Sequence, residues 1–177
     1  MNAELEKPYN IYLTGFRCTG KTSVGKALSA KIGWPFIDTD SLLVSESGIS
    51  IKEIVETLGW DTFRKMEHAI VSQVCILERR VVATGGGVVL NEANVNLMKK
   101  SGQIVWLKAV TETIKSRMML DQGTEAFRPS LTSKDSFSEI EETLIERNSY
   151  YNQAMDFSVE TDDRHLEEIC EEIVRKL

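Results

Sequence analysis

Short apolar runs alternate with helical patterns along most of the chain. Five apolar, β-prone runs predict strands at residues 9–14, 35–37, 81–83, 104–107 and 157–159. Elsewhere apolar residues recur three and four positions apart, which is typical of helices with one buried face. The predicted helices are 21–32, 40–47, 51–58, 60–79, 91–100, 111–119, 136–154 and 164–177. This alternation predicts a three-layer α/β fold, in which helices flank both faces of a five-stranded parallel sheet.

No internal repeat, low-complexity segment or linker interrupts this pattern, so we expect one domain over residues 1–177. One segment departs from it. Residues 120–133 have weak periodicity, a glycine, a proline and mixed charge, and they are too long for an ordinary connection. Loops of this length are usually lids or binding loops. From this segment alone, a lid and a surface insertion without function are equally favoured.

The overall charge limits the class of partner. The chain has 21 Lys and Arg residues against 27 Asp and Glu residues, a net charge of −6. This balance argues against nucleic acid or an anionic membrane as the main partner. The polar N-terminus does not resemble a signal peptide, and no apolar run approaches the roughly 20 residues of a membrane span. We expect a monomeric, cytoplasmic protein that binds small molecules and holds any anionic substrate with local arginines.

The clearest motif lies between the first strand and the first helix. Its eight residues read GFRCTGKT and fit G-x-x-x-x-G-K-[ST], the phosphate-binding loop (P-loop). Its N–H groups and the helix N-terminus favour phosphate, while Lys21 adds a full charge and the Thr22 hydroxyl suits Mg²⁺. The flanking strand and helix favour this interpretation over a chance glycine turn. The predicted ATP-binding residues are Gly15, Phe16, Arg17, Cys18, Thr19, Gly20, Lys21 and Thr22.

Two carboxylates, Asp38 and Asp40, follow the second predicted strand. Ligands of open α/β sheets bind beyond the carboxyl ends of the strands, so both carboxylates should face the site. One can hold Mg²⁺ through water, and the other can accept hydrogen bonds from substrate hydroxyls or take a proton from one. Alone, Asp40 would be interpreted as the N-cap of the next helix. Beside a P-loop the functional interpretation is favoured, and the two are compatible.

Arg64 and Glu67 are three residues apart and share a helix face. From the sequence alone, the favoured interpretation is a surface ion pair worth less than about 1 kcal/mol. The alternative is that Glu67 aims Arg64 at a substrate carboxylate, which a guanidinium holds bidentately. A run of three glycines, Gly85, Gly86 and Gly87, directly follows the third strand. Such a run indicates a close approach to the main chain and favours a ligand wall over a flexible turn.

Two further arginines are candidates. Arg128 lies in the suspected lid, where an arginine that closes on the γ-phosphate would stabilise transition-state charge and displace water. Arg147 lies in the next helix. It is a solvated arginine by default, and a second carboxylate clamp if that helix borders the cleft. His68 and His165 have no partner pattern, and we interpret them as surface or structural residues.

Six segments, in this order and at these intervals, resemble the shikimate kinase family: GFRCTGKT, FIDTD, FRKMEHAI, ATGGGVV, FRPSL and ERNSYYNQAMDF. The resemblance runs from about Asn10 to the C-terminus. It implies a P-loop kinase fold with strand order 2-3-1-4-5, a substrate-binding part at about 38–70 and a lid at about 119–133. It also implies phosphorylation of the 3-hydroxyl of shikimate, in aromatic amino-acid biosynthesis, with ATP as co-substrate and Mg²⁺ as cofactor.

The resemblance implies a role for each matching position. Catalysis falls to Lys21, Asp40 and Arg128, the last of which also contacts the ATP phosphate. Shikimate is held by Asp40, Arg64, Gly85, Gly86, Gly87 and Arg147. Mg²⁺ is bound by Thr22 and, through water, by Asp38. The loop at residues 161–164 corresponds to the adenine side of the site.

Some positions depart from the family's usual residues, and they concern nucleotide binding more than the reaction. Cys18 stands where glycine is usual, at a cost of roughly 1 kcal/mol if a positive φ is required. Beside a helix N-terminus and Lys21, it is also predicted to be a reactive thiol. Arg17 replaces a small apolar residue. The usual adenine-stacking arginine of the lid is absent from 118–126, and Arg117 lies upstream. The alternative functions are a kinase of another small hydroxy acid, such as gluconate, or a nucleotide-binding module without activity.

Overall fold

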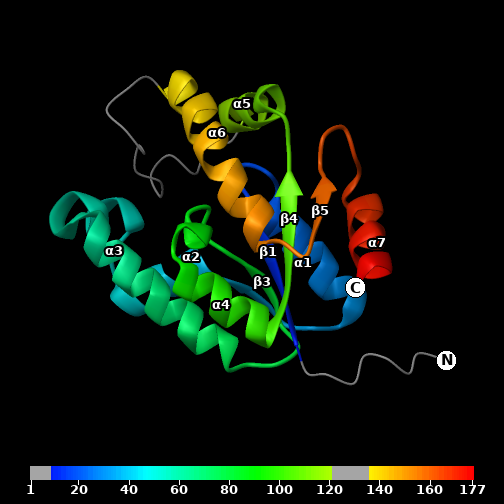
Figure 1. Cartoon of the computed structure of the whole chain (residues 1–177), viewed down its shortest axis with the longest axis horizontal. Helices are drawn as coiled ribbons and strands as arrows, with labels where there is room; N and C mark the ends of the chain where they lie inside the picture. The colour runs from blue at the N-terminus through cyan, green and yellow to red at the C-terminus, as the bar shows by residue number, and fades with distance from the viewer. Residues whose placement is uncertain (1–8, 121–135) are drawn as a thin grey trace.

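The sheet of this protein is parallel and has five strands, as predicted. The structure is a computed structural model that describes residues 9–120 and 136–177. The sheet order is β2-β3-β1-β4-β5, which confirms the predicted order (Figure 1). All four neighbouring pairs are parallel. The strands are β1 (Asn10–Thr14), β2 (Phe36–Asp38), β3 (Val81–Ala83), β4 (Gly102–Lys108) and β5 (Phe157–Glu160).

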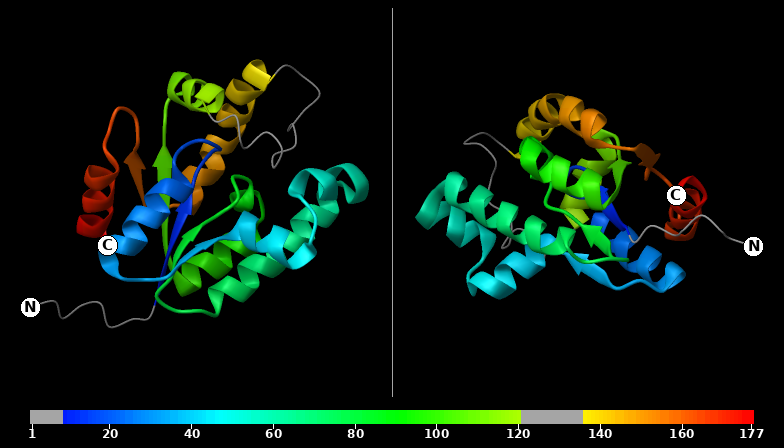
Figure 2. Two further views of the ribbon diagram at one scale, coloured as in Figure 1. Left: turned by 180° about the vertical axis from the view of Figure 1, so that it is seen from behind. Right: turned by 60° about the horizontal axis from the view of Figure 1, so that its bottom comes forward.

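Helices cover both faces of the sheet (Figure 2). They are α1 (Lys21–Ile32), α2 (Thr39–Ser47), α3 (Ile51–Cys75), α4 (Glu92–Ser101), α5 (Thr111–Leu120), α6 (Ser136–Ala154) and α7 (Leu166–Lys176), with a 3₁₀ turn η1 (Val88–Leu90). None of the described helices is long and apolar enough to cross a membrane.

The alternation of side chains along each strand divides the core into two layers. Ile11 and Leu13 of β1 pack with residues of α1 and α7, on one face of the sheet. Tyr12 between them packs with residues of α3, α4 and α6 on the other face. The short apolar runs therefore read as buried on both sides because each face of the sheet has its own helical layer.

The region around α3 differs most from the predicted boundaries. Two helices were predicted on either side of residue 59, and the structure confirms this break: within α3, Gly59 has non-helical angles, with a φ of 82° and a ψ of 165°. The predicted helix to residue 79 was too long, because α3 ends at Cys75. Leu77 N–H bonds to the carbonyl of Val74, and Arg79 has a φ of 55°, which turns the chain into β3.

The predicted lid at 119–133 lies almost entirely outside the described residues, and so does Arg128. Its described edges are the end of α5 and the start of α6. α5 and the start of α6 lie beyond the carboxyl end of β4, and the rest of α6 runs back along the sheet (Figure 1). This is the end of the sheet at which the P-loop also lies, because the loop directly follows β1.

Candidate active site

A cavity of about 840 Å³ lies at the carboxyl ends of the strands. It is lined by the P-loop from Phe16 onward, by Asp38 and Asp40, by the glycine run, and by arginines from three different helices. The predicted nucleotide and acceptor residues that the structure describes therefore meet in one cleft. Gly15 lies at the base of the P-loop and is not itself part of the lining.

The P-loop has the backbone that its glycines allow. Gly15 has a φ of 138°, and a Cβ atom there would overlap the carbonyl oxygen of Leu107. Gly20 caps α1 with a φ of 94°. Lys21 Nζ donates to the carbonyl oxygens of Gly15 and Phe16, at 2.8 and 2.7 Å. The ammonium group is thus held across the loop, next to the N-terminus of α1.

Cys18 adopts the conformation for which glycine is suited. Its φ is 60°, so the position requires the left-handed region and the predicted cost of roughly 1 kcal/mol applies. The side chain packs beside a small apolar cluster that includes Phe16, Ile114 and Ile140. This packing offsets part of the strain and joins the P-loop to α5 and α6.

Asp38 connects the P-loop helix to the start of α2. Its Oδ2 accepts a 2.9 Å hydrogen bond from Thr22 Oγ1, and its Oδ1 accepts from the N–H groups of Asp40 and Ser41. The N-cap of α2 is therefore Asp38, and the alternative that Asp40 is the cap is wrong. The carboxylate of Asp40 lies over the glycine run, since a Cβ atom on Gly85 would come within 2.8 Å of Asp40 Oδ1.

The Thr22 and Asp38 oxygens suit Mg²⁺, which prefers hard oxygen ligands and keeps several waters. A hydroxyl and a carboxylate oxygen only 2.9 Å apart, beside a phosphate-binding loop, match one direct and one water-mediated ligand. In the described part of the chain, no group of three His, Cys, Asp or Glu side chains could hold a metal by itself.

In the Arg64–Glu67 pair the acid is buried and the arginine is partly buried, so the interpretation as a surface ion pair was wrong. Arg64 Nη1 lies 2.8 Å from Glu67 Oε2, and Glu67 is only 2% exposed. The glycine run makes room for the pair. A Cβ atom at Gly87 would overlap the Arg64 guanidinium, and one at Gly85 would come within 2.8 Å of Glu67 Oε1.

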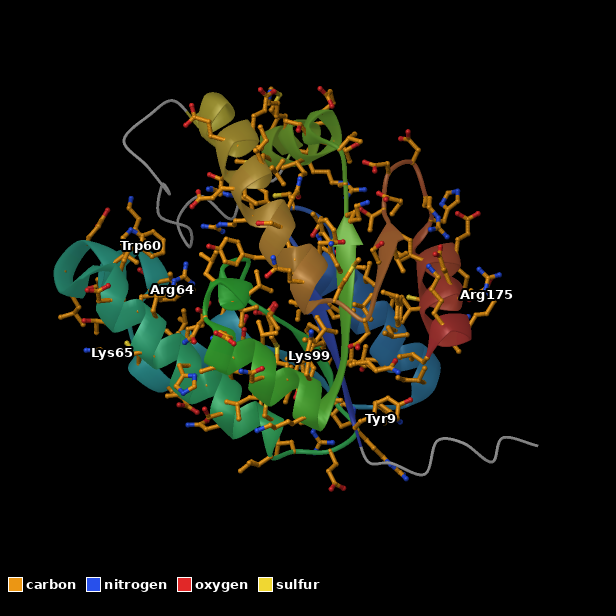
Figure 3. All side chains as sticks on the ribbon, in the orientation of Figure 1. Tyr9, Trp60, Arg64, Lys65, Lys99 and Arg175 are labelled. Atoms are coloured by element: carbon orange, nitrogen blue, oxygen red, sulfur yellow. The ribbon has the colours of Figure 1, made fainter. Side chains whose placement is uncertain are left out.

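Aromatic rings hold the guanidinium of Arg64 from the side of α3. Its Cζ atom lies 5.4 Å from the ring centre of Trp60 and 5.1 Å from that of Phe63. Trp60 and Arg64 lie together on α3 just after the kink at Gly59, and both border the cleft (Figure 3). The planar group is therefore fixed by an acid and two rings, with donors left for an anion.

The charge state of Glu67 depends on two opposing effects. Burial raises the pKa of Glu67, while the charges of Arg64 and, more weakly, Arg147 lower it; the net direction is upward. Glu67 Oε1 has no hydrogen-bond partner among the described residues. Arg64, which is bonded to Oε2, is thus the main partner of this buried carboxylate among the described residues.

Arg147 is also buried, at 9% exposure, and is not the solvated arginine expected by default. Its Nη1 approaches the carbonyl oxygen of Gly86 at 3.4 Å. Tyr151, one turn later on α6, donates to the same oxygen. Sequence reasoning did not single out Tyr151, although its spacing of four from Arg147 indicated a shared helix face.

Arg117 is the arginine that the sequence appeared to place too far from the site, and it lines the cleft. Nη2 donates to the Thr161 carbonyl at 2.6 Å, and Nη1 donates to Thr161 Oγ1 at 3.1 Å and to the Cys18 carbonyl at 3.2 Å. It therefore joins the P-loop to the predicted adenine-side loop. Its position in the last turn of α5, which leads into the lid segment, was the available signal.

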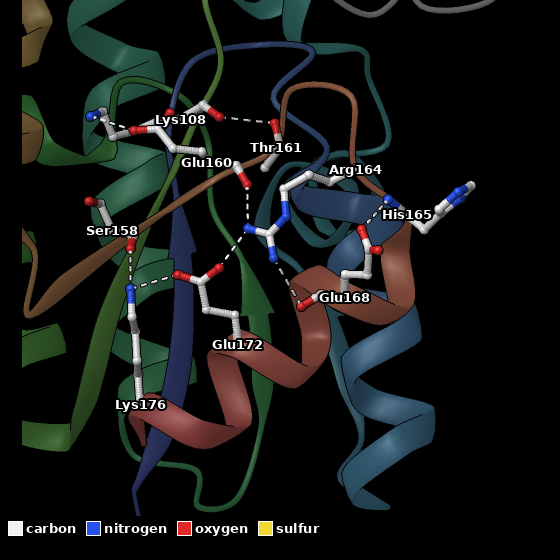
Figure 4. Close-up of polar contacts among 9 residues, drawn as sticks. All are labelled: Lys108, Ser158, Glu160, Thr161, Arg164, His165, Glu168, Glu172 and Lys176. Atoms are coloured by element: carbon white, nitrogen blue, oxygen red, sulfur yellow. Dashed lines mark hydrogen bonds and ion pairs between the residues drawn. The ribbon is translucent and has the colours of Figure 1, made fainter.

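The loop at residues 161–164, which was predicted to border the adenine, is fixed at both ends (Figure 4). Thr161 N–H and Oγ1 both donate to the carbonyl of Lys108 in β4, at 2.8 and 3.0 Å. Arg164 bonds to the carbonyl of Glu160 and, at 2.6 Å, to Glu172 of α7. His165 caps α7, with Glu168 bonded back to its N–H, which fits a structural role for this histidine.

Comparison with known proteins agrees with this geometry. A sequence model of the family described as shikimate kinase matches residues 17–177. The shikimate kinase of Caldanaerobacter subterraneus subsp. tengcongensis is 42% identical over 166 residues, 94% of each chain. That of Rhodopirellula baltica is 35% identical over 99% of this chain and 94% of its own.

A solved structure agrees with the sequence comparison. Shikimate kinase from Acinetobacter baumannii, solved in complex with shikimate, superposes with a TM-score of 0.88 at 27% identity, over 97% of this chain and 93% of that one. The chain described here belongs to the shikimate kinase family.

Proposed function

We propose that this protein transfers the γ-phosphoryl group of ATP to the 3-hydroxyl of shikimate. The observation that carries the proposal is a single cleft lined by both a P-loop and the Arg64–Glu67 pair, whose acid is buried. A P-loop alone is common to many nucleotide-binding proteins, whereas an acid-binding guanidinium beside it narrows the acceptor to a small anion. Membership of the shikimate kinase family supports shikimate as that anion.

On the nucleotide side, the N–H groups of the P-loop and the Lys21 ammonium hold the phosphates of ATP. Thr22 Oγ1 and, through water, Asp38 would hold Mg²⁺, which supplies neutralisation of phosphate charge when it is bound. Arg117 and the loop that begins at Thr161 border the adenine. Arg117 thereby takes the place of the lid arginine that the sequence lacks downstream.

On the acceptor side, Arg64 and Arg147 flank the glycine run and hold the carboxylate of shikimate. Arg147 is buried and Arg64 is partly buried, so both guanidinium groups attract an anion more strongly than fully exposed arginines would. This local positive charge acts against the net charge of −6 of the whole chain. The glycines allow the ring of the substrate to approach the main chain closely.

Asp40 is placed to act on the substrate hydroxyls. It lies between the P-loop and Gly85, so its carboxylate can orient the 3-hydroxyl towards the γ-phosphate and accept its proton. The transition state of phosphoryl transfer is loose, so positioning and charge neutralisation supply most of the catalysis. The role of Arg128 at the transferring phosphate rests on the sequence resemblance. The described site residues come from one chain, so we propose that a monomer is active.

A substrate panel tests the proposed function. ADP release is measured with ATP and Mg²⁺ in the presence of shikimate, of quinate, of gluconate, or of no acceptor. We expect turnover with shikimate to exceed that with every other acid by at least about 100-fold, since a site built to bind specific polar groups rejects analogues that lack them. Preferred turnover of gluconate would support the kinase of another hydroxy acid. Equal slow hydrolysis under all conditions would support a nucleotide-binding module.

A further inference from the structure

Tyr151 of α6 is bonded to the glycine run from the buried side. Its Oη donates a 2.5 Å hydrogen bond to the carbonyl oxygen of Gly86, and Arg147 Nη1 approaches the same oxygen at 3.4 Å. The Tyr151 side chain is fully buried, and its ring stacks on Trp106 of β4, with ring centres 5.5 Å apart. Two donors from α6 therefore fix the direction of one carbonyl group in the wall of the cleft.

The direction of this carbonyl also fixes the next N–H group. The C=O of Gly86 and the N–H of Gly87 belong to one peptide unit, and in a trans peptide they point in opposite directions. The described residues contain no cis peptide bond. The Gly87 N–H thus points away from Tyr151, at a position that lines the cleft. Within the described part of the chain, no backbone or side-chain acceptor is bonded to it.

The guanidinium groups of Arg64 and Arg147 approach this peptide unit at different residues. The Arg64 group lies directly against Gly87, where a Cβ atom would overlap it, and Arg147 contacts Gly86. Arg64 and the Gly87 N–H therefore share one part of the cleft, and Arg147 approaches the same peptide unit from its carbonyl side. An anion bound by Arg64 would find the Gly87 N–H beside it.

We propose that Tyr151 is a positioning residue for the acid acceptor. Its hydroxyl holds the Gly86–Gly87 peptide in the orientation in which the Gly87 N–H acts as a third donor to the substrate carboxylate, beside Arg64 and Arg147. This inference rests on the proposed function, because it takes the acceptor to be a carboxylate. Helix α6, which follows the predicted lid, would then act on the acceptor site in two ways. It supplies the Arg147 side chain, and through Tyr151 it orients the backbone of the glycine run.

Both the Gly86–Gly87 peptide and the Tyr151 side chain have properties that suit this role. Two adjacent glycines have the widest choice of backbone conformations, so this peptide unit depends on outside contacts to keep one orientation. Burial raises the pKa of Tyr151 to about 12, so its hydroxyl remains a donor throughout the pH range of enzyme assays. The stack on Trp106 holds the ring in place, so the bond to Gly86 is set by the core of the protein.

The test begins with Tyr151→Phe, which removes the hydroxyl but retains the ring that stacks on Trp106. We expect the KM for shikimate to rise about fivefold to tenfold, the effect of one lost buried hydrogen bond, with the KM for ATP changed less than about twofold. The matched control is Tyr150→Phe, the same chemical change at the exposed neighbouring position, which should leave both constants unchanged. Circular dichroism spectra of both variants are compared with that of the wild type.

A substrate without the carboxylate charge separates positioning from a general loss of structure. With the methyl ester of shikimate, the wild type and Tyr151→Phe should have nearly equal KM values, because the third donor no longer faces an anion. An equal rise in KM for acid and ester, or no rise for the acid, would overturn the role of Tyr151 and leave the proposed function intact. Absence of shikimate-dependent ADP release in the wild type would overturn both.

Discussion

Arg64 Nη1 lies 2.8 Å from Glu67 Oε2 in a position where Glu67 is almost completely buried. The pair stands on one helix, but its burial comes from the glycine run that follows β3, since side chains at Gly85 and Gly87 would occupy the same space. A buried pair is costly to break from one side, because the remaining charge is left without compensation. The relationship therefore links the stability of the protein to its acid-binding site.

The pKa of Glu67 gives a pH dependence with a definite sign. Its folded pKa is raised, chiefly by burial, so the folded state holds this proton more tightly than the unfolded state. The resulting stability is fully present below the unfolded pKa and is lost as the pH rises through the folded pKa. We predict that the free energy of unfolding of the wild type, relative to Glu67→Gln, decreases over that window.

Urea unfolding at a series of pH values from about 4 to 8 measures this difference, in a range that begins near the usual glutamate pKa. Glu56→Gln is the matched control, since Glu56 is an exposed acid on the same helix. The free energy of unfolding of the control should change with pH as that of the wild type does. If the free energy of unfolding of Glu67→Gln also changes in this way, then Glu67 does not titrate as its burial implies.

Arg117 joins the two loops of the nucleotide side, so its removal should affect ATP and not the acceptor. For Arg117→Ala we predict a rise in the KM for ATP of about 10-fold, the effect of losing charge-assisted hydrogen bonds, with the KM for shikimate nearly unchanged. Lys115→Ala is the control, because Lys115 lies on the same helix but is bonded to Glu141. A rise in the KM for shikimate without a rise in the KM for ATP would contradict the assignment of Arg117 to the nucleotide-binding side of the cleft.

Cys18 lines the cleft inside the P-loop, so bound nucleotide should shield its thiol. We predict that saturating ADP with Mg²⁺ slows alkylation of Cys18 by iodoacetamide at least about fivefold, since thiol reactions depend on access. Mass spectrometry of the modified peptide separates Cys18 from Cys75, which is remote from the P-loop and serves as the internal control. An unchanged rate at Cys18 would mean that the phosphates are bound elsewhere.

The sequence predicted the sheet and the P-loop well because both depend on local patterns. The alternation of apolar and polar positions encodes strands and helices directly, and the P-loop is a contiguous segment of eight residues. The boundary of α3 was misjudged because nothing local marks the turn after Cys75, where Arg79 takes a positive φ. The break at Gly59 was predicted correctly, because a glycine between two helical patterns marks it locally.

The acceptor site was less predictable, because its geometry depends on residues far apart in the sequence. The burial of Glu67 requires the glycines at 85 and 87, and the contact of Arg117 with Cys18 spans 99 positions. Tyr151 becomes visible as a candidate only when Gly86 is seen against α6. Helical spacing indicated that Arg64 shares a face with Glu67. Tertiary packing decides which residues that face contacts.

The central claim is that Arg64 and Arg147 hold the carboxylate of shikimate in the cleft that also holds ATP. The most direct measurement is the KM for shikimate in Arg64→Ala and Arg147→Ala, with Arg175→Ala, an exposed arginine on α7, as the control (Figure 3). We predict a rise of about 10- to 100-fold for each site variant, the loss of one charge-assisted contact, with the KM for ATP and the control unchanged. Wild-type KM values for shikimate in both site variants would contradict the account.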